Sequence, residues 1–204
     1  RLTILLPNHA RPFSASISEL SEVSKLKGLS GISITDHDTC KGALKAEKMV
    51  SEYDDFTVIP SVEISTQFGH VIMMYVNEEI QTKNFYEVVD YAKDNDKILY
   101  FPHPGRSRKF SSIIAQSADA IEVINGHSRP DQNIYSKFLQ EEYCKTAVSG
   151  SDAHKLKEIG RCTTSFPGYS EDEVRNSIAK GNTQVNGFFK TFNNLGKKAQ
   201  NFFL

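Results

Sequence analysis

The chain has 204 residues, 39% of them hydrophobic, which fits one globular domain with a sizeable core. Its 24 Lys and Arg nearly balance 25 Asp and Glu, so the net charge of -1 provides no overall basic field for nucleic acid or a membrane, although a locally basic groove remains open. Three widely spaced cysteines without a C-x-x-C pair favour a reducing cytoplasm over a disulfide framework, and neither a secretory signal nor an apolar run of ~18 residues is visible.

Short apolar runs alternate with stretches of helical periodicity through most of the chain. Residues 16–19 form a capping-box pattern that starts a helix over 17–27, which Gly28 and Gly31 end. The same patterns predict helices at 41–53, 82–94, 111–117, 130–142 and 171–180, and strands at 2–6, 32–35, 57–59, 62–65, 71–76, 98–101, 120–124 and 146–149. This alternation predicts an α/β fold with parallel strands inside and helices outside. About six or seven such units suit a small or distorted barrel.

One domain is the economical interpretation, because the chain has no internal repeat, low-complexity tract or linker. We expect a domain over 1–187 and a C-terminal tail over 188–204 that is rich in Lys, Asn and Phe. The apolar residues of this amphipathic tail predict a terminal helix that packs on the domain. A tail that binds a partner or dimerises is the alternative.

The predicted strand ends carry potential metal ligands. Thr35–Asp38 follows one strand directly, and a helix N-cap would explain one of its aspartates but not its histidine. Glu63 stands between Val62 and Ile64, where a buried strand should be apolar. A buried carboxylate is costly unless it is paired or coordinates a cation. A salt bridge is therefore the plainer alternative to a metal at this position.

Three later strands show the same feature at one end. His70 opens an apolar strand, although a single histidine there could equally be a hydrogen-bonded core residue. His103 lies between two prolines, which makes a rigid mount for an imidazole. Asp152 and His154 follow a further strand. Imidazole and carboxylate groups suit zinc, iron and manganese, and clustered ions activate water and bind a phosphoryl group.

Taken in order, these motifs resemble the PHP (polymerase and histidinol phosphatase) family, small stand-alone phosphoesterase type. The most telling segments are Thr35-Asp36-His37-Asp38-Thr39 and Gly150-Ser151-Asp152-Ala153-His154, and the resemblance covers Ile4 to about Val185. It implies a TIM-like, distorted (β/α)7 barrel. It also implies that a metal-bound hydroxide hydrolyses a phosphoester of a small phosphorylated metabolite or nucleotide.

The resemblance further implies two to three divalent metal ions, Zn, Mn or Fe. The implied ligand sets are His9, Glu63 and Asp152 for a first ion, Glu63, His70 and His103 for a second, and His37 and His154 for a third. Glu63 would thus bridge two ions. Asp36 and His37 are the expected catalytic residues.

The first motif departs from the family pattern, which usually reads Asp-Leu-His-x-His. Here the matching stretch is Leu5-Leu6-Pro7-Asn8-His9, so Leu5 and Pro7 replace the aspartate and the first histidine. Ala15 stands where some relatives carry another ligand. Either the site binds fewer ions, or residues of a metal-site loop are missing from this stretch.

Two arginines are the best candidates to bind phosphate oxygens in a bidentate manner, because they lie nearest to predicted strand ends. These are Arg106 and Arg129, and a solvated surface charge is the alternative for each. His127 matches no ligand motif and is interpreted as a structural or rim residue.

Two other functions stay open. One is a catalytically weakened PHP-fold binding or scaffold protein with a nucleic-acid-processing partner. The other is a different metal-dependent hydrolase such as an amidohydrolase. The sequence predicts a small phosphorylated substrate and no membrane partner, does not favour nucleic acid, and leaves the oligomeric state undefined.

Overall fold

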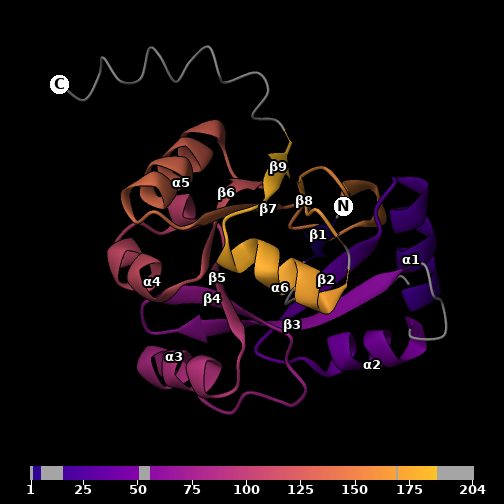
Figure 1. Cartoon of the computed structure of the whole chain (residues 1–204), viewed down its shortest axis with the longest axis horizontal. Coiled ribbons are helices and arrows are strands. Elements are labelled where there is room, and N and C mark those ends of the chain that lie inside the picture. Colours follow the sequence, from indigo (N-terminus) through magenta and orange to yellow (C-terminus); the bar gives the residue numbers. More distant parts are fainter. Residues whose placement is uncertain (1, 6–15, 51–55, 169, 188–204) are drawn as a thin grey trace.

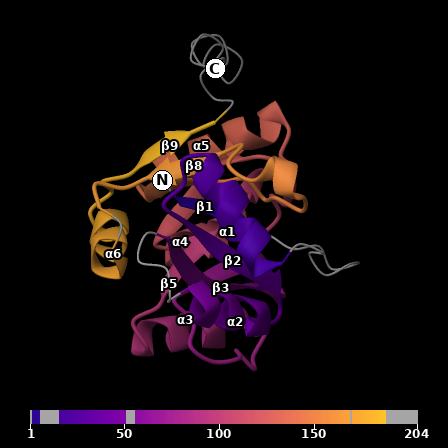
Figure 2. The same cartoon turned by 90° about the vertical axis from the view of Figure 1, so that its right-hand side faces the viewer.

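The computed structural model describes residues 2–5, 16–50, 56–168 and 170–187, so His9, Ala15 and the predicted tail lie outside the described residues. One nine-stranded sheet curls around an interior, with most helices around its outer side and one, α6, across its inner face (Figure 1, Figure 2). Its strands are β1 (Leu2–Leu5), β2 (Gly31–His37), β3 (Thr57–Thr66), β4 (Gly69–Met74), β5 (Ile98–Phe101), β6 (Ala120–Asn125), β7 (Thr146–Gly150), β8 (Thr163–Ser165) and β9 (Gln184–Asn186). Its helices are α1 (Ile17–Leu26), α2 (Lys41–Val50), α3 (Phe85–Asp94), α4 (Ser111–Ser117), α5 (Pro130–Glu142) and α6 (Glu171–Ala179), with short 3-10 turns η1 (Pro104–Arg106) and η2 (Leu156–Glu158).

The strand order is β7-β6-β5-β4-β3-β2-β1-β8-β9. The α/β prediction is confirmed, but the expectation of parallel strands throughout was wrong. Strands β1 to β3 are parallel, as are β5 to β7, whereas β4 runs antiparallel to both of its neighbours. The reason is that β3 turns directly into β4, and a tight hairpin can join only antiparallel strands. The sheet is therefore a curled half-barrel of mixed direction.

The two sides of this sheet, at β7 and at β8, are joined by hydrogen bonds that involve side chains. The backbone N–H of Ser149 in β7 donates to Oγ1 of Thr164 in β8 at 2.8 Å, and the Ser149 hydroxyl donates to the Thr163 carbonyl at 2.6 Å. Strands β8 and β9 are each three residues long, too short to leave a periodic signal in the sequence. These two strands were not predicted.

The predicted helices are present, with apolar stripes facing the sheet. Ser16 and Glu19 form the predicted capping box at the start of α1. The stripe of α3 contains Phe85, Val88, Val89 and Ala92, all buried. Strand β3 is continuous where 57–59 and 62–65 were predicted separately, because Pro60 pairs in register with β2 and its carbonyl accepts from Val76 N–H.

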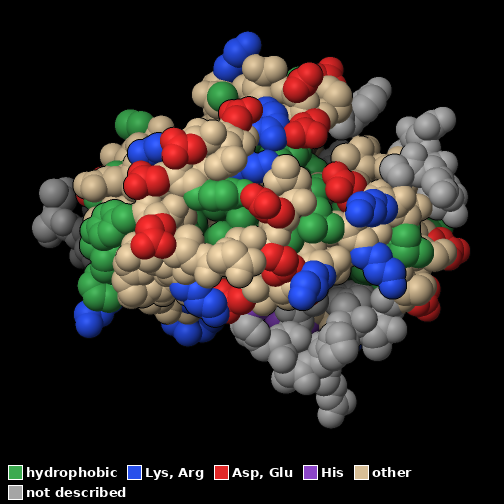
Figure 3. Space-filling model, turned by 90° about the horizontal axis from the view of Figure 1, so that it is seen from below, with side chains coloured by type: hydrophobic (Ala, Val, Ile, Leu, Met, Phe, Trp, Pro, Cys, Tyr) green, Lys and Arg blue, Asp and Glu red, His purple; other side chains and the backbone are tan. Residues whose placement is uncertain are grey.

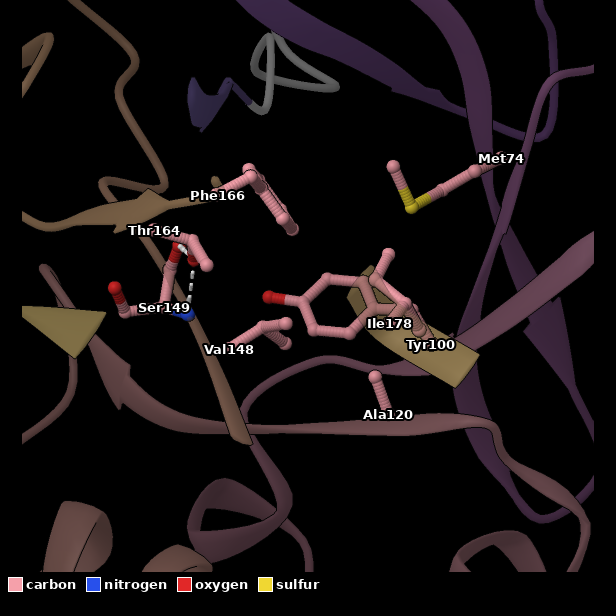
Figure 4. Close-up of a pocket in the computed structure, with 8 residues that line it drawn as sticks. All are labelled: Met74, Tyr100, Ala120, Val148, Ser149, Thr164, Phe166 and Ile178. Carbon is pink, nitrogen blue, oxygen red and sulfur yellow. Dashed lines mark hydrogen bonds between the residues drawn. The ribbon is translucent and has the colours of Figure 1, made fainter. Parts of the chain in front are cut away.

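The amino ends of the parallel strands are closed by apolar side chains. Ile178 and Val174 of α6 pack with Met74, Tyr100 and Val148 on the inner face of the sheet. Figure 4 shows the Tyr100 hydroxyl pointing toward Ser149 and Thr164 within this apolar space. Polar groups that face the interior therefore gather at the opposite, carboxyl ends of the strands.

Acidic and basic side chains are interspersed on the face drawn in Figure 3. None of the helices within 16–50, 56–168 and 170–187 combines the length and apolar character that crossing a membrane requires.

Candidate metal centre

The alternation of side chains along β2 and β3 places polar residues on the inner face of the sheet. His37 is the cross-strand partner of Glu63 in the parallel register. Deeper in the sheet, Ser33 and Ser61 share a hydrogen bond of 2.8 Å between their hydroxyls. Successive side chains of a strand point to opposite faces, so Val62, next to Glu63, joins the outer apolar core. The pattern thus brings His37 and Glu63 side by side.

Three imidazoles surround the carboxylate of Glu63, whose side chain is 0% exposed. His70 Nδ1 lies 2.7 Å and His103 Nε2 3.3 Å from Glu63 Oε1, while His37 Nε2 lies 3.3 Å from Oε2. Among the described residues neither Glu63 oxygen accepts a regular hydrogen bond, so these contacts are close approaches between possible ligand atoms. Crowded ligand atoms that do not bond to one another fit a shared cation. We call these four residues the Glu63 group.

The electrostatics of the Glu63 group keep the carboxylate ionised. Burial acts to raise the pKa of Glu63, but the facing imidazoles of His103 and His70 outweigh it and hold the pKa well below its usual range. The His70 ring meets those of His37 and His103 edge-on, with centroids 5.0 and 5.8 Å apart. Ligand atoms of His37, Glu63 and His70 all lie within 4.8 Å of one another, close enough to hold one ion.

Asp38 fastens the end of β2 beside this group. Its backbone N–H donates to the Glu63 carbonyl at 2.9 Å, and its Oδ1 accepts from Ser65 N–H at 2.8 Å. Its φ of 57° lies in the left-handed region, as do those of His103 and Asp152 at 37° and 51°. Such strained backbone is commonly held at functional sites, where surrounding contacts over-determine it.

The His103 loop is held from behind by a second buried carboxylate. His103 N–H donates to Glu122 Oε2 at 2.8 Å, and burial raises the pKa of Glu122 to about 7. Gly105 is needed in the loop because an added Cβ would lie 2.1 Å from the Gln132 carbonyl oxygen of α5. We did not predict a site role for Glu122, although it carries the same signal as Glu63, a carboxylate within an apolar strand.

Arg106 places a positive charge on Asp152. Its Nη2 donates to Asp152 Oδ2 at 2.6 Å and to Asn125 Oδ1 at 2.7 Å, and its Nε donates to Ser128 Oγ at 3.1 Å. Asp152 is buried, and its Oδ1 has no hydrogen-bond partner among the described residues. The guanidinium therefore neutralises a carboxylate that was expected to bind the first ion. Asn125, at the end of β6, is a further site residue, for which no role was predicted from the sequence.

The structure separates the remaining candidates. His154 lies with His127 and Glu158 rather than in the Glu63 group. Asp36 occupies the face of β2 opposite His37, with its Oδ2 only 2.5 Å from where a Cβ on Gly42 of α2 would stand. The catalytic roles of Asp36 and His37 and the metal roles of Asp152 and His154 stay predictions, and that of His9 falls outside the described residues.

Sequence comparisons connect the chain to proteins whose functions are not defined. Residues 130–183 match a family described as PHP-associated. The uncharacterized protein MJ1587 of Methanocaldococcus jannaschii is 30% identical over 124 residues, which are 57% of this chain and 72% of that protein. A second uncharacterized protein of the same organism, MJ0417, is 30% identical over 120 residues, or 53% of this chain. The match covers 51% of MJ0417, so the chain spans about half the length of that relative.

Solved structures share the fold at low sequence identity. PsfC from Pseudomonas syringae has a TM-score of 0.66 at 14% identity, with 98% of each chain covered. A candidate metal-dependent phosphoesterase from Bifidobacterium adolescentis has a TM-score of 0.64 at 14% identity, covering 88% of this chain and 96% of that one. An amidohydrolase from Chromobacterium violaceum, with bound sulfate and no metal, has a TM-score of 0.62 at 12% identity, covering 78% and 89%. These likenesses concern the fold alone.

Proposed function

This chain belongs to the PHP family, and on that premise we propose that it is a metal-dependent phosphoesterase acting on a small phosphorylated metabolite or nucleotide. The observation that carries the proposal is the buried, ionised carboxylate of Glu63 with three imidazoles around it. The fold shared with a candidate metal-dependent phosphoesterase supports the same reaction class.

The proposed ligands are His37, Glu63 and His70, together with His103, whose Nε2 lies 3.3 Å from Glu63, and Glu63 would bridge two of two to three ions of Zn, Mn or Fe type. A divalent ion held there polarises a phosphoryl oxygen and offsets the negative charge that develops on it. The chain's own part is positional. The His103 backbone amide donates to Glu122 and the Asp38 backbone amide donates to the Glu63 carbonyl, and these two bonds hold the ligand-bearing ends of β5 and β2 in place.

Arg106 is the proposed phosphate-binding residue. Its Nη2 and Nε are held by Asp152, Asn125 and Ser128, while its Nη1 makes no hydrogen bond within the described part of the chain. This arrangement fixes the guanidinium and leaves one edge for a phosphate oxygen. Arg129 differs, because Nε and Nη2 both bind the Asp131 carboxylate at 3.0 Å and already occupy its fork. A substrate role for Arg129 stays a prediction.

We also propose that the curled half-barrel is a distorted (β/α)7 barrel, which the hydrogen bonds between β7 and β8 support. The single domain over 1–187, the tail over 188–204 and the cytoplasmic location stay predictions.

Metal loading of the full chain tests the proposed function. The protein is stripped with a chelator and reloaded with Mn²⁺, Zn²⁺ or Fe²⁺. Bound metal is measured by elemental analysis. Turnover is measured first with an aryl phosphate and then with a panel of phosphomonoesters, phosphodiesters and amides. We expect hydrolysis of phosphoesters that requires the reloaded metal. Less than about one tightly bound ion per chain and no aryl phosphate hydrolysis would favour the binding-protein alternative. Cleavage of amides alone would favour a different hydrolase.

A further inference from the structure

A second group of metal-ligand side chains shares no residue with the Glu63 group. It consists of His127, His154 and Glu158, whose ligand atoms all lie within 4.8 Å of one another. His127 follows β6, His154 follows β7, and Glu158 belongs to η2, so three separate segments contribute one residue each. The imidazoles are 33% and 30% exposed and the carboxylate 9%, which leaves the imidazole side open to solvent.

The carboxylate of this group is held in place by the chain itself. His154 N–H donates to Glu158 Oε2 at 3.0 Å, and His127 Nε2 lies 3.3 Å from the same oxygen. The two rings meet edge-on with centroids 5.2 Å apart. The backbone N–H of His127 donates to Asn125 Oδ1 at 2.9 Å, which fixes the loop that carries the ring. These two backbone hydrogen bonds therefore position the group without using an imidazole nitrogen. The contact from His127 Nε2 to Glu158 does use one, and an ion would replace that contact.

The tautomer of His154 favours a ligand role. Its Nδ1 lies 2.8 Å from the Asp152 carbonyl oxygen, and a carbonyl oxygen can only accept. Nδ1 of the neutral ring therefore carries the proton, and Nε2 presents its lone pair. A ring N–H donated to a backbone carbonyl is the usual outer support of a metal-binding histidine, because it sets both tautomer and orientation.

We propose that His127, His154 and Glu158 form a second divalent-metal site, of the two-histidine, one-carboxylate kind that suits zinc. Such a ligand set leaves one position of a tetrahedral ion for water or for an oxygen of a bound molecule. The plainer explanation of these contacts is an ion pair between His127 and Glu158. The two explanations differ in what they expect of metal content.

Arg106 keeps this site distinct from the Glu63 group. Asp152 precedes His154 by two residues, and its Oδ2 is bound by the guanidinium at 2.6 Å. A carboxylate already neutralised by arginine is a poor partner for a further cation. His154 thus shares a group with His127, a residue outside every ligand motif, and could bind an ion without His37. The second site does not rest on the proposed hydrolysis.

Metal titration of the full chain tests this second site. Apo protein is dialysed against Zn²⁺, and bound ions are counted for the wild type, His127→Asn, His70→Asn and the double variant. We expect each single variant to lose at least about one ion per chain, and the losses to add in the double variant. Glu141→Gln, in which an exposed carboxylate paired with Lys137 is altered, is the control and should lose none.

A spectroscopic readout separates the second site from the proposed activity. Reloading with Co²⁺ should give visible ligand-field absorption, part of which His127→Asn removes while His70→Asn leaves that part intact. Unchanged zinc content and an unchanged cobalt spectrum in His127→Asn would overturn the proposal and leave the ion pair. If His127→Asn loses an ion and its part of the cobalt spectrum but the wild type hydrolyses no phosphoester, the second site stands and the proposed function fails.

Discussion

The amino ends and the carboxyl ends of the parallel strands are lined by opposite kinds of side chain. At the amino ends, Met74, Tyr100 and Ile178 make an apolar layer beneath α6. At the carboxyl ends, Glu63 and Glu122 are buried charged or ionisable groups within strands. A buried carboxylate costs several kcal/mol unless other charges or hydrogen bonds offset that cost, roughly as much as a well-packed apolar side chain contributes.

This contrast indicates that the two strand ends have different roles. The apolar amino ends stabilise the fold, whereas buried charge and left-handed backbone at His103 and Asp152 lower stability at the carboxyl ends. Substitutions at the two ends should therefore separate metal binding from folding stability.

The largest expected effect comes from Glu63→Gln. The amide cannot offset the charge of a cation shared with three imidazoles, so we expect bound metal to fall by more than one ion and turnover to be lost. Removing an outer support of a ligand typically costs about 10–100-fold in metal affinity, and removing a ligand should cost more. Elemental analysis and aryl phosphate hydrolysis measure both effects.

The control for Glu63→Gln is Asp119→Asn, which changes an exposed carboxylate that accepts from Leu99 N–H outside the site. It should keep full metal content. Full metal content in Glu63→Gln itself would contradict the assignment of the Glu63 group.

Much of this division could be predicted from local patterns. The capping box at Ser16 and Glu19 was predicted because it needs only four consecutive residues. Glu63 was identified because a carboxylate in an apolar strand conflicts with its surroundings. Both signals are contained in a short stretch of chain, so neither depends on knowing how the strands pair.

The rest depended on contacts between distant segments. The reversal of β4 is the exception, because the short link between β3 and β4 is a local hairpin signal that was missed. The pairing of Arg106 with Asp152 spans 46 residues, and that of His127 with Glu158 spans 31. Such pairs follow from tertiary packing. The motifs therefore predicted that His154 shares an ion with His37, whereas the fold places His154 beside His127.

At the apolar end, Ile178→Ala should lower the free energy of unfolding by about 2–5 kcal/mol, because a buried side chain leaves a cavity beneath α6. Metal content at saturating zinc should stay unchanged in the folded protein. Chemical denaturation measures the first quantity and dialysis the second. Leu26→Ala, at an 80% exposed position of α1, is the control with little expected change. Loss of metal in folded Ile178→Ala would mean that the two ends are not separable.

Asn125→Ala tests whether a polar residue at the carboxyl end of β6 serves metal binding as well as stability. The amide binds Arg106 Nη2 at 2.7 Å and Glu122 Oε2 at 2.9 Å, so its loss frees both the phosphate-binding arginine and the support behind His103. We expect a loss of about 1–3 kcal/mol in stability and about 10-fold in metal affinity. Asn186→Ala removes a comparable hydrogen bond to Ser165 far along the chain and should leave metal affinity intact. An effect on stability alone would place Asn125 in the scaffold.

The smallest effect is expected from Lys83→Ala at the rim of the carboxyl end. Lys83 Nζ lies 2.7 Å from Asp38 Oδ2, but its side chain is 60% exposed, and exposed ion pairs contribute about 0–1 kcal/mol. Asp38 keeps its bond from Ser65 N–H, so the end of β2 should stay in place and metal affinity should be unchanged. Urea unfolding at low and high salt should show a small loss that salt abolishes, as in Lys137→Ala, which breaks a surface pair with Glu141. A marked loss of metal in Lys83→Ala would show that surface charge takes part in holding the site, and would move the boundary of the charged end out to the rim.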